Sequence, residues 1–287
     1  MAKGRELKGR IKSVENTRKI TKTMEMVATS KMKRAQDRVV GARPFATALG
    51  EVIAGLYTPD LAERFPLLRQ PSGTPKRAAV MLLTGNRGLA GAFNSNLIRE
   101  ARNLIAKLEE GGTQVELHAV GKKGLGYFRY VGRTVASSKI DLGDRPTAAD
   151  AAGLVDALMQ RFTSGEIDAV YIVYAKFVSA LSTPATTDRV LPVTPPERKG
   201  ATPDYLLFPS AEAILDKLLP AYVRNAVYRA IVETIAGFYS AQRTAMKNAT
   251  DNAGEMLNLL RRTYNRARQA QITQEIAEIV GGAAALE

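Results

Sequence analysis

The first part of the chain carries apolar or small residues at steps that alternate between three and four. This spacing places them on one narrow stripe of an α-helix, of the kind that packs against a partner helix in a coiled coil. Pro44 is expected to kink the helix, because its ring clashes one turn back and it lacks an N–H donor. The pattern predicts a helix from about Leu7 to Tyr57 with the stripe Leu7, Ile11, Val14, Thr17, Thr21, Met24, Ala28, Met32, Ala35, Val39, Ala42, Ala46, Leu49, Ile53 and Leu56.

The last part of the chain shows the same helical spacing. Ser210 is placed to cap a short helix that ends at Leu219, and Pro220 fits the first position of a new helix. We expect this helix to run from Ala221 to about Val280 and to end at the two glycines that follow. Its predicted stripe is rich in small and polar residues: Val227, Ala230, Thr234, Phe238, Ala241, Ala245, Asn248, Asn252, Met256, Leu259 and Thr263.

Between these helices the pattern is that of an α/β domain. Helical patterns alternate with short apolar runs, which favours a mostly parallel sheet. Prolines flank the last run, which indicates an edge strand. The predicted strands are 78–83, 115–120, 169–178 and 186–193, and the predicted helices are 95–108, 122–130 and 148–162.

Changes in composition divide the chain into four parts. Two segments rich in proline, 66–76 and 192–209, are typical of linkers or domain ends. The predicted parts are an N-terminal shaft helix (1–60), a linker (61–76), a central α/β base domain (77–209) and a C-terminal shaft helix (210–287).

The lengths of the terminal helices limit the fold. A compact globule of this chain length is roughly 50 Å across. The predicted helices would be ~75 Å and ~90 Å long, at 1.5 Å per residue. Neither fits inside such a globule, so we expect both to project and to pack on each other. The predicted fold class is α/β, with a long antiparallel coiled coil formed by the N- and C-terminal helices and a central Rossmann-like α/β domain.

The composition removes several kinds of chemistry. None of the 287 residues is Cys, which excludes disulfides, thiolate metal sites and cysteine nucleophiles. The single histidine, His118, lies in an apolar run, where a core or half-buried imidazole is more common than a catalytic one. No apolar run approaches the ~20 residues of a membrane span, and we find no secretory signal. We therefore expect a soluble, cytosol-type protein with no catalytic, cofactor or metal site.

A Gly-rich segment is a candidate phosphate loop. The glycines of Thr84–Asn94 (TGNRGLAGAFN) match neither G-x-G-x-x-G nor a Walker A pattern. Gly121-Lys122-Lys123 lacks the Ser or Thr that would bind Mg²⁺ in a Walker A loop. Asp141 and Asp144 lie in a Gly-containing loop without further oxygen ligands. We interpret all of these segments as structural turns.

Positive charge is concentrated at the start of the chain. The net charge is +13, and residues 1–43 hold thirteen Lys or Arg against four Asp or Glu, a net charge of +9. Such a field steers the segment toward a polyanion, which can be nucleic acid, an anionic membrane or an acidic protein surface. A solvated helix face that aids solubility is the alternative, because charge alone names no partner.

Three segments carry a family resemblance. They are KGRIKSVENTRKITKTMEMVATSKMKRAQ at 8–36, RGLAGAFN at 87–94 and RTAMKNATDNAGEMLNLLRRTYNRARQAQITQEIAEIVGGAAAL at 243–286. In amino-acid sequence, order and spacing these segments resemble the gamma subunits of F-type rotary ATP synthases over essentially the whole chain. One departure is Asn86, because the family usually carries an acidic residue before Arg-Gly-Leu. A charge pair made by that acid is therefore in question in this chain.

The resemblance implies a central-stalk rotor that couples proton flow to ATP synthesis or hydrolysis. The coiled coil would stand inside a ring of three alpha and three beta subunits. The α/β base would rest on the c-ring with the epsilon subunit, at the cytoplasmic face of the cell membrane, as a peripheral membrane protein. The catalytic groups would belong to beta, and this chain would be a non-catalytic subunit.

The resemblance also implies contacts for residues that match the family's motifs. Lys19, Lys22 and Met24 would face an acidic lever loop of a beta subunit, although an ordinary seam position explains Met24 equally well. Arg268 and Gln269 would hydrogen-bond to a catch loop on beta.

Three more residues are implied to act within the shaft. Arg243, Thr273 and Glu275 would help to hold the two helices in register and to couple rotation to catalysis.

Two other classes of function stay open at this point. A basic coiled-coil nucleic-acid-binding protein would explain the charged segment, although no aromatic residues interleave with the basic ones and no known module is present. A Rossmann-like nucleotide-binding enzyme would explain the central domain, although its fingerprint loop is missing. Co-purification with alpha and beta subunits, with nucleic acid or with a cofactor would separate the three.

Overall fold

A computed structural model describes residues 2–70, 73–194 and 210–284 of the chain. Its contacts divide the chain into two compact units. One unit joins the chain ends, Met1–Ala28 and Gln242–Glu287, and the other comprises Thr29–Ala241. The four-part division predicted from the sequence places its boundaries elsewhere and stays a prediction, and the proline-rich end predicted for the central domain lies largely in 195–209, outside the described residues.

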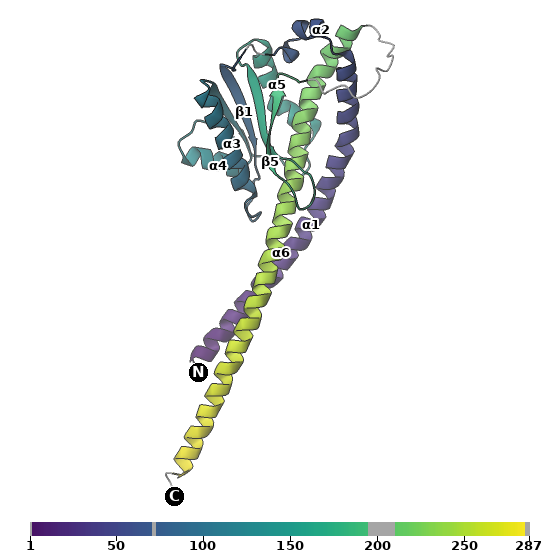
Figure 1. Ribbon diagram of the computed structural model, residues 1–287. Helices are drawn as coiled ribbons and strands as arrows, with labels where there is room; N and C mark the ends of the chain where they lie inside the picture. Colours follow the sequence, from purple (N-terminus) through teal and green to yellow (C-terminus); the bar gives the residue numbers. More distant parts are fainter. Residues whose placement is uncertain (1, 71–72, 195–209, 285–287) are drawn as a thin grey trace. The chain divides into compact units, whose positions relative to one another are not determined.

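Two long helices pass from one unit into the other. They are α1 (Ala2–Leu56), drawn in purple in Figure 1, and α6 (Ala211–Ala284), drawn from green to yellow. The long terminal helices predicted from the sequence are therefore confirmed. Pro44 lies inside α1 and does not interrupt it. Fourteen of the fifteen residues in the predicted α1 stripe are buried or half-buried, and Thr17 alone is exposed.

Helix α6 differs from its prediction at both ends. It is one continuous helix with Pro220 in its interior, where we expected a new helix to begin. A proline inside a helix costs about 3 kcal/mol. Around it Leu215, Leu219 and Val223 are fully buried, at about 1.5–3 kcal/mol for each side chain, so packing outweighs the lost backbone hydrogen bond. Ser210 is confirmed as the cap, because the Ala213 N–H donates to its Oγ at 3.2 Å.

The predicted stop at the glycines after Val280 is wrong, because α6 continues to Ala284. Gly281 does not adopt the positive φ by which a glycine ends a helix.

The central domain is built on a five-stranded sheet with the order β3-β2-β1-β4-β5. Four strands are parallel and β5 pairs antiparallel with β4 at an edge, so the mostly parallel sheet and its edge strand are confirmed. The short strand β3 was not predicted, because its sequence (SSK) has no apolar pattern. The strands are β1 (Arg77–Leu83), β2 (Gln114–Val120), β3 (Ser137–Lys139), β4 (Ala169–Ala175) and β5 (Ala185–Leu191).

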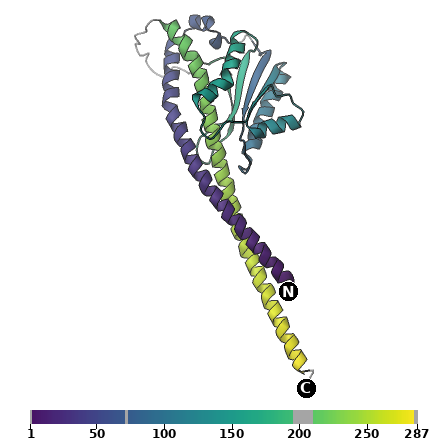
Figure 2. The ribbon, with the colours of Figure 1, turned by 180° about the vertical axis from the view of Figure 1, so that it is seen from behind.

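Helices cover both faces of this sheet. Figures 1 and 2 show α3 and α4 on one face and α5 on the other. One core joins α5 to the sheet and to the parts of α1 and α6 in the same unit, and a second core joins α3 and α4 to the opposite face. The shorter helices are α2 (Pro59–Arg64), the 3₁₀ turn Pro66–Leu68, α3 (Phe93–Glu110), α4 (Lys122–Tyr130) and α5 (Ala148–Thr163).

Strand β1 lies at the centre of both cores. Successive side chains of a strand point to opposite faces of the sheet. Ala79, Met81 and Leu83 accordingly belong to the core with α5, whereas Val80 and Leu82 belong to the core with α3. A strand buried on both sides reads as a continuous apolar run, which explains why the sequence located it.

By length and composition alone, the α1 segment Gly4–Leu56 could cross a membrane, contrary to our expectation. A core helix meets the same criteria. The apolar end of α1 places Leu49, Ile53 and Leu56 in the core with α5. We therefore interpret this segment as a core helix.

Candidate functional site: the paired chain ends

The unit formed by the chain ends is a pair of antiparallel helices. Thr21 of α1 lies beside Thr250 of α6, with their hydroxyl oxygens 2.8 Å apart. Nearer the start of α1, Glu15 pairs with Arg261 at 3.7 Å. A lower residue number on α1 thus meets a higher one on α6, as the predicted antiparallel pairing requires.

The buried seam of this pair is made of small and medium-sized side chains. On α1 it includes Thr21 and Ala28, which were both predicted. On α6 the buried residues are Met246, Thr250, Ala253 and Leu257, at steps of four, three and four.

The α6 stripe predicted for this region is wrong. Its members Asn248, Asn252, Met256, Leu259 and Thr263 are all exposed. Both stripes have coiled-coil spacing, and they differ by two residues in phase. The true stripe carries less polar side chains, but the position of α1 is what makes it the inner one.

The two threonine hydroxyls hold the seam by hydrogen bonds. Each hydroxyl has one proton and two acceptor lone pairs. Thr21 Oγ1 lies 3.1 Å from the Arg18 carbonyl, and Thr250 Oγ1 lies 2.8 Å from the Met246 carbonyl. One hydroxyl donates across the seam while the other donates to its own helix, so both protons are used in either arrangement.

The residues implied on α1 lie near this threonine pair in the sequence. Lys19 is exposed, and Met24 is half-buried on the predicted stripe. Lys22 is exposed and donates to Glu25 at 3.2 Å, one turn along the same helix. Because the Lys22 side chain is 57% exposed, solvent screens this pair and leaves the lysine available to another acid.

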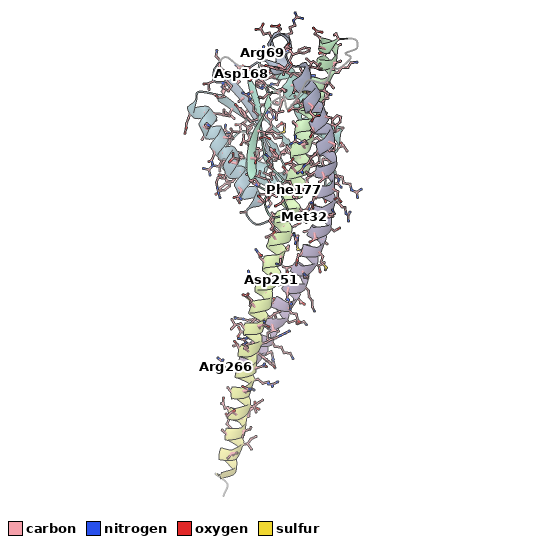
Figure 3. The ribbon with its side chains drawn as sticks, turned by 45° about the vertical axis from the view of Figure 1, so that its right-hand side comes forward. Met32, Arg69, Asp168, Phe177, Asp251 and Arg266 are labelled. Atoms are coloured by element: carbon pink, nitrogen blue, oxygen red, sulfur yellow. The ribbon has the colours of Figure 1, made fainter. Side chains whose placement is uncertain are left out.

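The residues implied on α6 are spread along the helix. Arg243 is half-buried, whereas Arg268 and Gln269 are exposed. Thr273 is exposed and donates to the Gln269 carbonyl at 3.0 Å, and Glu275 accepts from Gln271 at 2.9 Å. These two bonds lie within α6, whereas the Thr21–Thr250 and Glu15–Arg261 pairs join the two helices in this unit. Figure 3 labels two further exposed residues of this part of α6, Asp251 and Arg266.

The surface of the pair changes character along α6. Residues 272–281 are all exposed, and they include Ile272, Ile276, Ile279 and Val280, which are 46–72% exposed. The segment 1–28 instead holds eight Lys or Arg against three Glu. The pair therefore offers a basic surface on α1 and an apolar one near the end of α6.

In the other unit, two residues of α6 bind the end of strand β4. Thr234 Oγ1 accepts from the Ala175 N–H at 3.3 Å, and the buried carboxylate of Glu233 accepts from the Phe177 N–H at 3.0 Å. Phe177, labelled in Figure 3, packs with an apolar cluster of α1 and α6 residues. The sheet and α6 are thus joined by buried polar bonds as well as by apolar packing.

A charged cluster that sequence reasoning missed joins three elements of the same unit. Asp144, interpreted above as a turn residue, accepts from Lys31 of α1 at 2.7 Å and from Tyr239 of α6 at 2.5 Å. Its carbonyl accepts from Arg38 of α1 at 2.6 Å. Burial alone would raise the pKa of Asp144, but the bonds from Lys31 and Tyr239 outweigh burial and hold this pKa below its ordinary value. Only the tertiary structure brings these residues together.

The Gly-rich loop after β1 is closed by bonds within the protein. The Gly85 N–H donates to Asn94 Oδ1 at 2.8 Å, and at the start of α4 the Lys122 N–H donates to Asn86 Oδ1 at 3.0 Å. Asn86 Nδ2 also donates to the Leu142 carbonyl at 3.2 Å. Asn86 therefore needs both its donor and its acceptor here, which a carboxylate could not supply. This bonding supports the interpretation as a structural turn.

His118 is half-buried, as predicted. Its Nδ1 lies 2.7 Å from Ser137 Oγ, and its Nε2 lies 3.8 Å from a Glu116 oxygen, too far for a hydrogen bond. Burial, which disfavours the charged ring, lowers the pKa of His118. Among the described residues, no group of three or more His, Asp or Glu is placed to hold a metal ion.

A pair of antiparallel helices from both ends of one chain, with an α/β domain inserted between them, defines a stalk-type subunit of a larger assembly. The ATP synthase family model matches residues 3–286. The chain belongs to the ATP synthase gamma chain family.

Curated relatives and solved structures agree with this assignment. The chain is 68% identical to the ATP synthase gamma chain of Gemmatimonas aurantiaca, over 100% of both chains. It is 45% identical to that of Streptomyces coelicolor, over 98% of this chain and 95% of the relative. A chain in the central stalk and c-ring structure of the Tetrahymena thermophila mitochondrial ATP synthase is 26% identical, with a TM-score of 0.62 over 80% of this chain and 99% of that one. The nucleic-acid-binding alternative finds no support in these comparisons.

Proposed function

We propose that this chain is the central-stalk rotor of a proton-translocating F-type ATP synthase, and that it couples proton flow to ATP synthesis and hydrolysis. The observation that carries the proposal is the helix pair formed by the two chain ends, with the α/β domain inserted between them. Membership of the gamma chain family supports it.

A rotor acts through contacts that differ between states. A ligand or partner shifts an equilibrium only by its differential affinity for the two states. The helix pair is asymmetric, because its basic and apolar surfaces lie on different parts of α1 and α6. Inside a ring of three alpha and three beta subunits, it would present a different surface to each beta site and change all three in turn as it rotates.

The exposed residues on the pair supply these contacts. Lys19 and Lys22 are exposed on α1 and suit an acidic lever loop of beta, with Met24 beside them. Arg268 and Gln269 are exposed on α6 and suit a catch loop of beta. Charge-assisted hydrogen bonds of this kind are among the stronger polar contacts.

Three residues would hold the pair and transmit its motion. Arg243 is half-buried, and Thr273 and Glu275 reinforce α6 through bonds to neighbouring turns. Their proposed role is to keep α6 in register and stiff while the pair rotates.

The remaining assignments concern the whole assembly. The α/β domain would rest on the c-ring with the epsilon subunit, at the cytoplasmic face of the cell membrane, as a peripheral membrane protein. The catalytic groups would belong to beta, and this chain would be a non-catalytic subunit of the complex.

Reconstitution tests the proposal. Purified alpha and beta subunits are assayed for ATP hydrolysis with and without this chain, and we expect at least a tenfold increase when it is added. A chain shortened after residue 241, which removes the α6 half of the helix pair, is the control. Assembly of all three subunits without any gain in turnover would contradict the rotor and favour a passive scaffold.

A further inference from the structure

A cavity of about 460 Å³ lies at the carboxyl ends of strands β1 and β2. Its apolar walls include Ile140 and Leu142 from the loop after β3, and Ile231, Ile235 and Phe238 from α6. In α/β sheets, ligands bind in crevices outside the carboxyl ends of the strands, and small-molecule sites typically measure 300–1,000 Å³. The cavity has the position and the size of a ligand site.

Most polar groups in this cavity are already bonded within the protein. The Thr84 hydroxyl accepts from the Gly124 N–H at 2.9 Å, and Asn86 accepts from the Lys122 N–H at 3.0 Å. Asp144 is neutralised by Lys31 at 2.7 Å. The first backbone donors of α4 are therefore not available to a phosphate, which argues against a nucleotide bound at that helix.

Two cationic side chains of the lining make no close bond, although the charge of Arg87 is felt by Asp144. Arg87 and Lys122 are exposed, and neither side chain makes a hydrogen bond or ion pair with a described residue. They lie on the two loops that follow β1 and β2, and both line the cavity. Apolar walls beside two unpaired cations fit a molecule with an apolar body and an anionic group.

We propose that this cavity binds a small anionic molecule with a compact aromatic body. The body lies against Ile235 and Phe238 of α6, and the anionic group lies at Arg87 and Lys122. The inference does not depend on the rotor function, because every residue it uses lies in the Thr29–Ala241 unit.

The test uses the full chain and a fluorescent aromatic sulfonate, 8-anilinonaphthalene-1-sulfonate, titrated to saturation. Its uncharged analogue, N-phenyl-1-naphthylamine, measures binding that needs no anionic group. The Arg87→Gln/Lys122→Gln double variant should weaken sulfonate binding at least tenfold and leave binding of the uncharged probe within twofold. Arg102→Gln/Lys107→Gln removes two exposed cations of α3 outside the cavity and serves as the matched control.

A second variant tests the cavity itself. A Cβ added at Gly143, which lines the cavity, would meet no atom within 4 Å, so Gly143→Phe starts from open space and adds bulk at the cavity. Gly153→Phe adds the same ring on α5 outside the cavity, at a position where an added Cβ also meets no atom within 4 Å. We expect Gly143→Phe to weaken sulfonate binding at least fivefold and Gly153→Phe to leave it unchanged.

Circular dichroism confirms that each variant is folded before titration. Equal sulfonate affinity in the wild type and in both cavity variants would place the probe on exposed apolar surface and overturn the proposal. Equal loss in the Arg102→Gln/Lys107→Gln control would reduce the effect to overall charge and overturn it as well.

Discussion

The hydroxyl pair Thr21–Thr250 should be the energetic link that fixes the register of the paired chain ends. Thr250→Val keeps the shape of the side chain and removes the hydroxyl from a buried position. The remaining Thr21 hydroxyl still donates to the Arg18 carbonyl at 3.1 Å, so no proton is left unsatisfied. The cost is therefore that of one net hydrogen bond, about 1 kcal/mol. Thr21→Val should cost the same, because Thr250 retains the Met246 carbonyl at 2.8 Å.

The double variant distinguishes a coupled pair from two independent hydroxyls. Replacing both partners of a hydrogen bond by apolar groups of the same shape is close to neutral. We therefore expect the double variant to cost no more than either single one, about 1 kcal/mol, whereas independent sites would add to about 2 kcal/mol.

Hydrogen exchange measured by mass spectrometry reads this cost locally. A loss of 1 kcal/mol raises the opening constant about fivefold. Peptides that span Thr21 and Thr250 should exchange about fivefold faster than in the wild type in each single variant. In the double variant they should exchange no faster than in either single variant. Thr17→Val is the matched control, because the Thr17 hydroxyl is exposed and bonds only to its own helix. Additive acceleration in the double variant would refute the coupling.

Burial lowers the pKa of His118, so as the pH falls the unfolded chain takes up this proton before the folded one does. The free energy of unfolding should therefore fall as the pH drops below about 6.5. Denaturation measured at a series of pH values should show this dependence in the wild type and not in His118→Gln. Gly121→Ala should destabilise the protein by more than about 3 kcal/mol, because φ at Gly121 is +98° and the new Cβ would lie 2.1 Å from the Thr84 carbonyl oxygen. Gly126→Ala, in open space on α4, should instead stabilise the protein by about 0.5–1 kcal/mol. A thermal unfolding series compares the two, and equal shifts would contradict the turn argument. Arg268→Ala should leave the complex with alpha and beta assembled while lowering ATP turnover by about tenfold to a hundredfold, as expected for a lost contact of about 1.5–3 kcal/mol made only in some states. Intact turnover would remove Arg268 from the proposed site.

The sequence located the elements whose signals are local. The strands β1 and β4 read as apolar runs because both faces of each are covered, and Ser210 was identified as a cap from its place before a helical pattern. The stripe of α1 was found because its residues alternate by threes and fours over many turns. Motifs at the two ends of the chain also indicated the family, and the contacts proposed for Arg268 and Gln269 come from the same motifs and stay a prediction.

The tertiary structure decided what depends on distant partners. On α6, two stripes of equal spacing compete, and Thr250 and Leu257 are inside only because α1 covers that side. Pro220 lies within a helix because the surrounding leucines are buried. The free energy gained by burying them depends on the tertiary structure and is not part of the helix propensity of the local sequence. Asp144 bonds to Lys31 and Tyr239, which are 113 and 95 residues away along the chain. Local patterns specify elements, whereas the inner face of a helix and the partners of a charge follow from the folded arrangement.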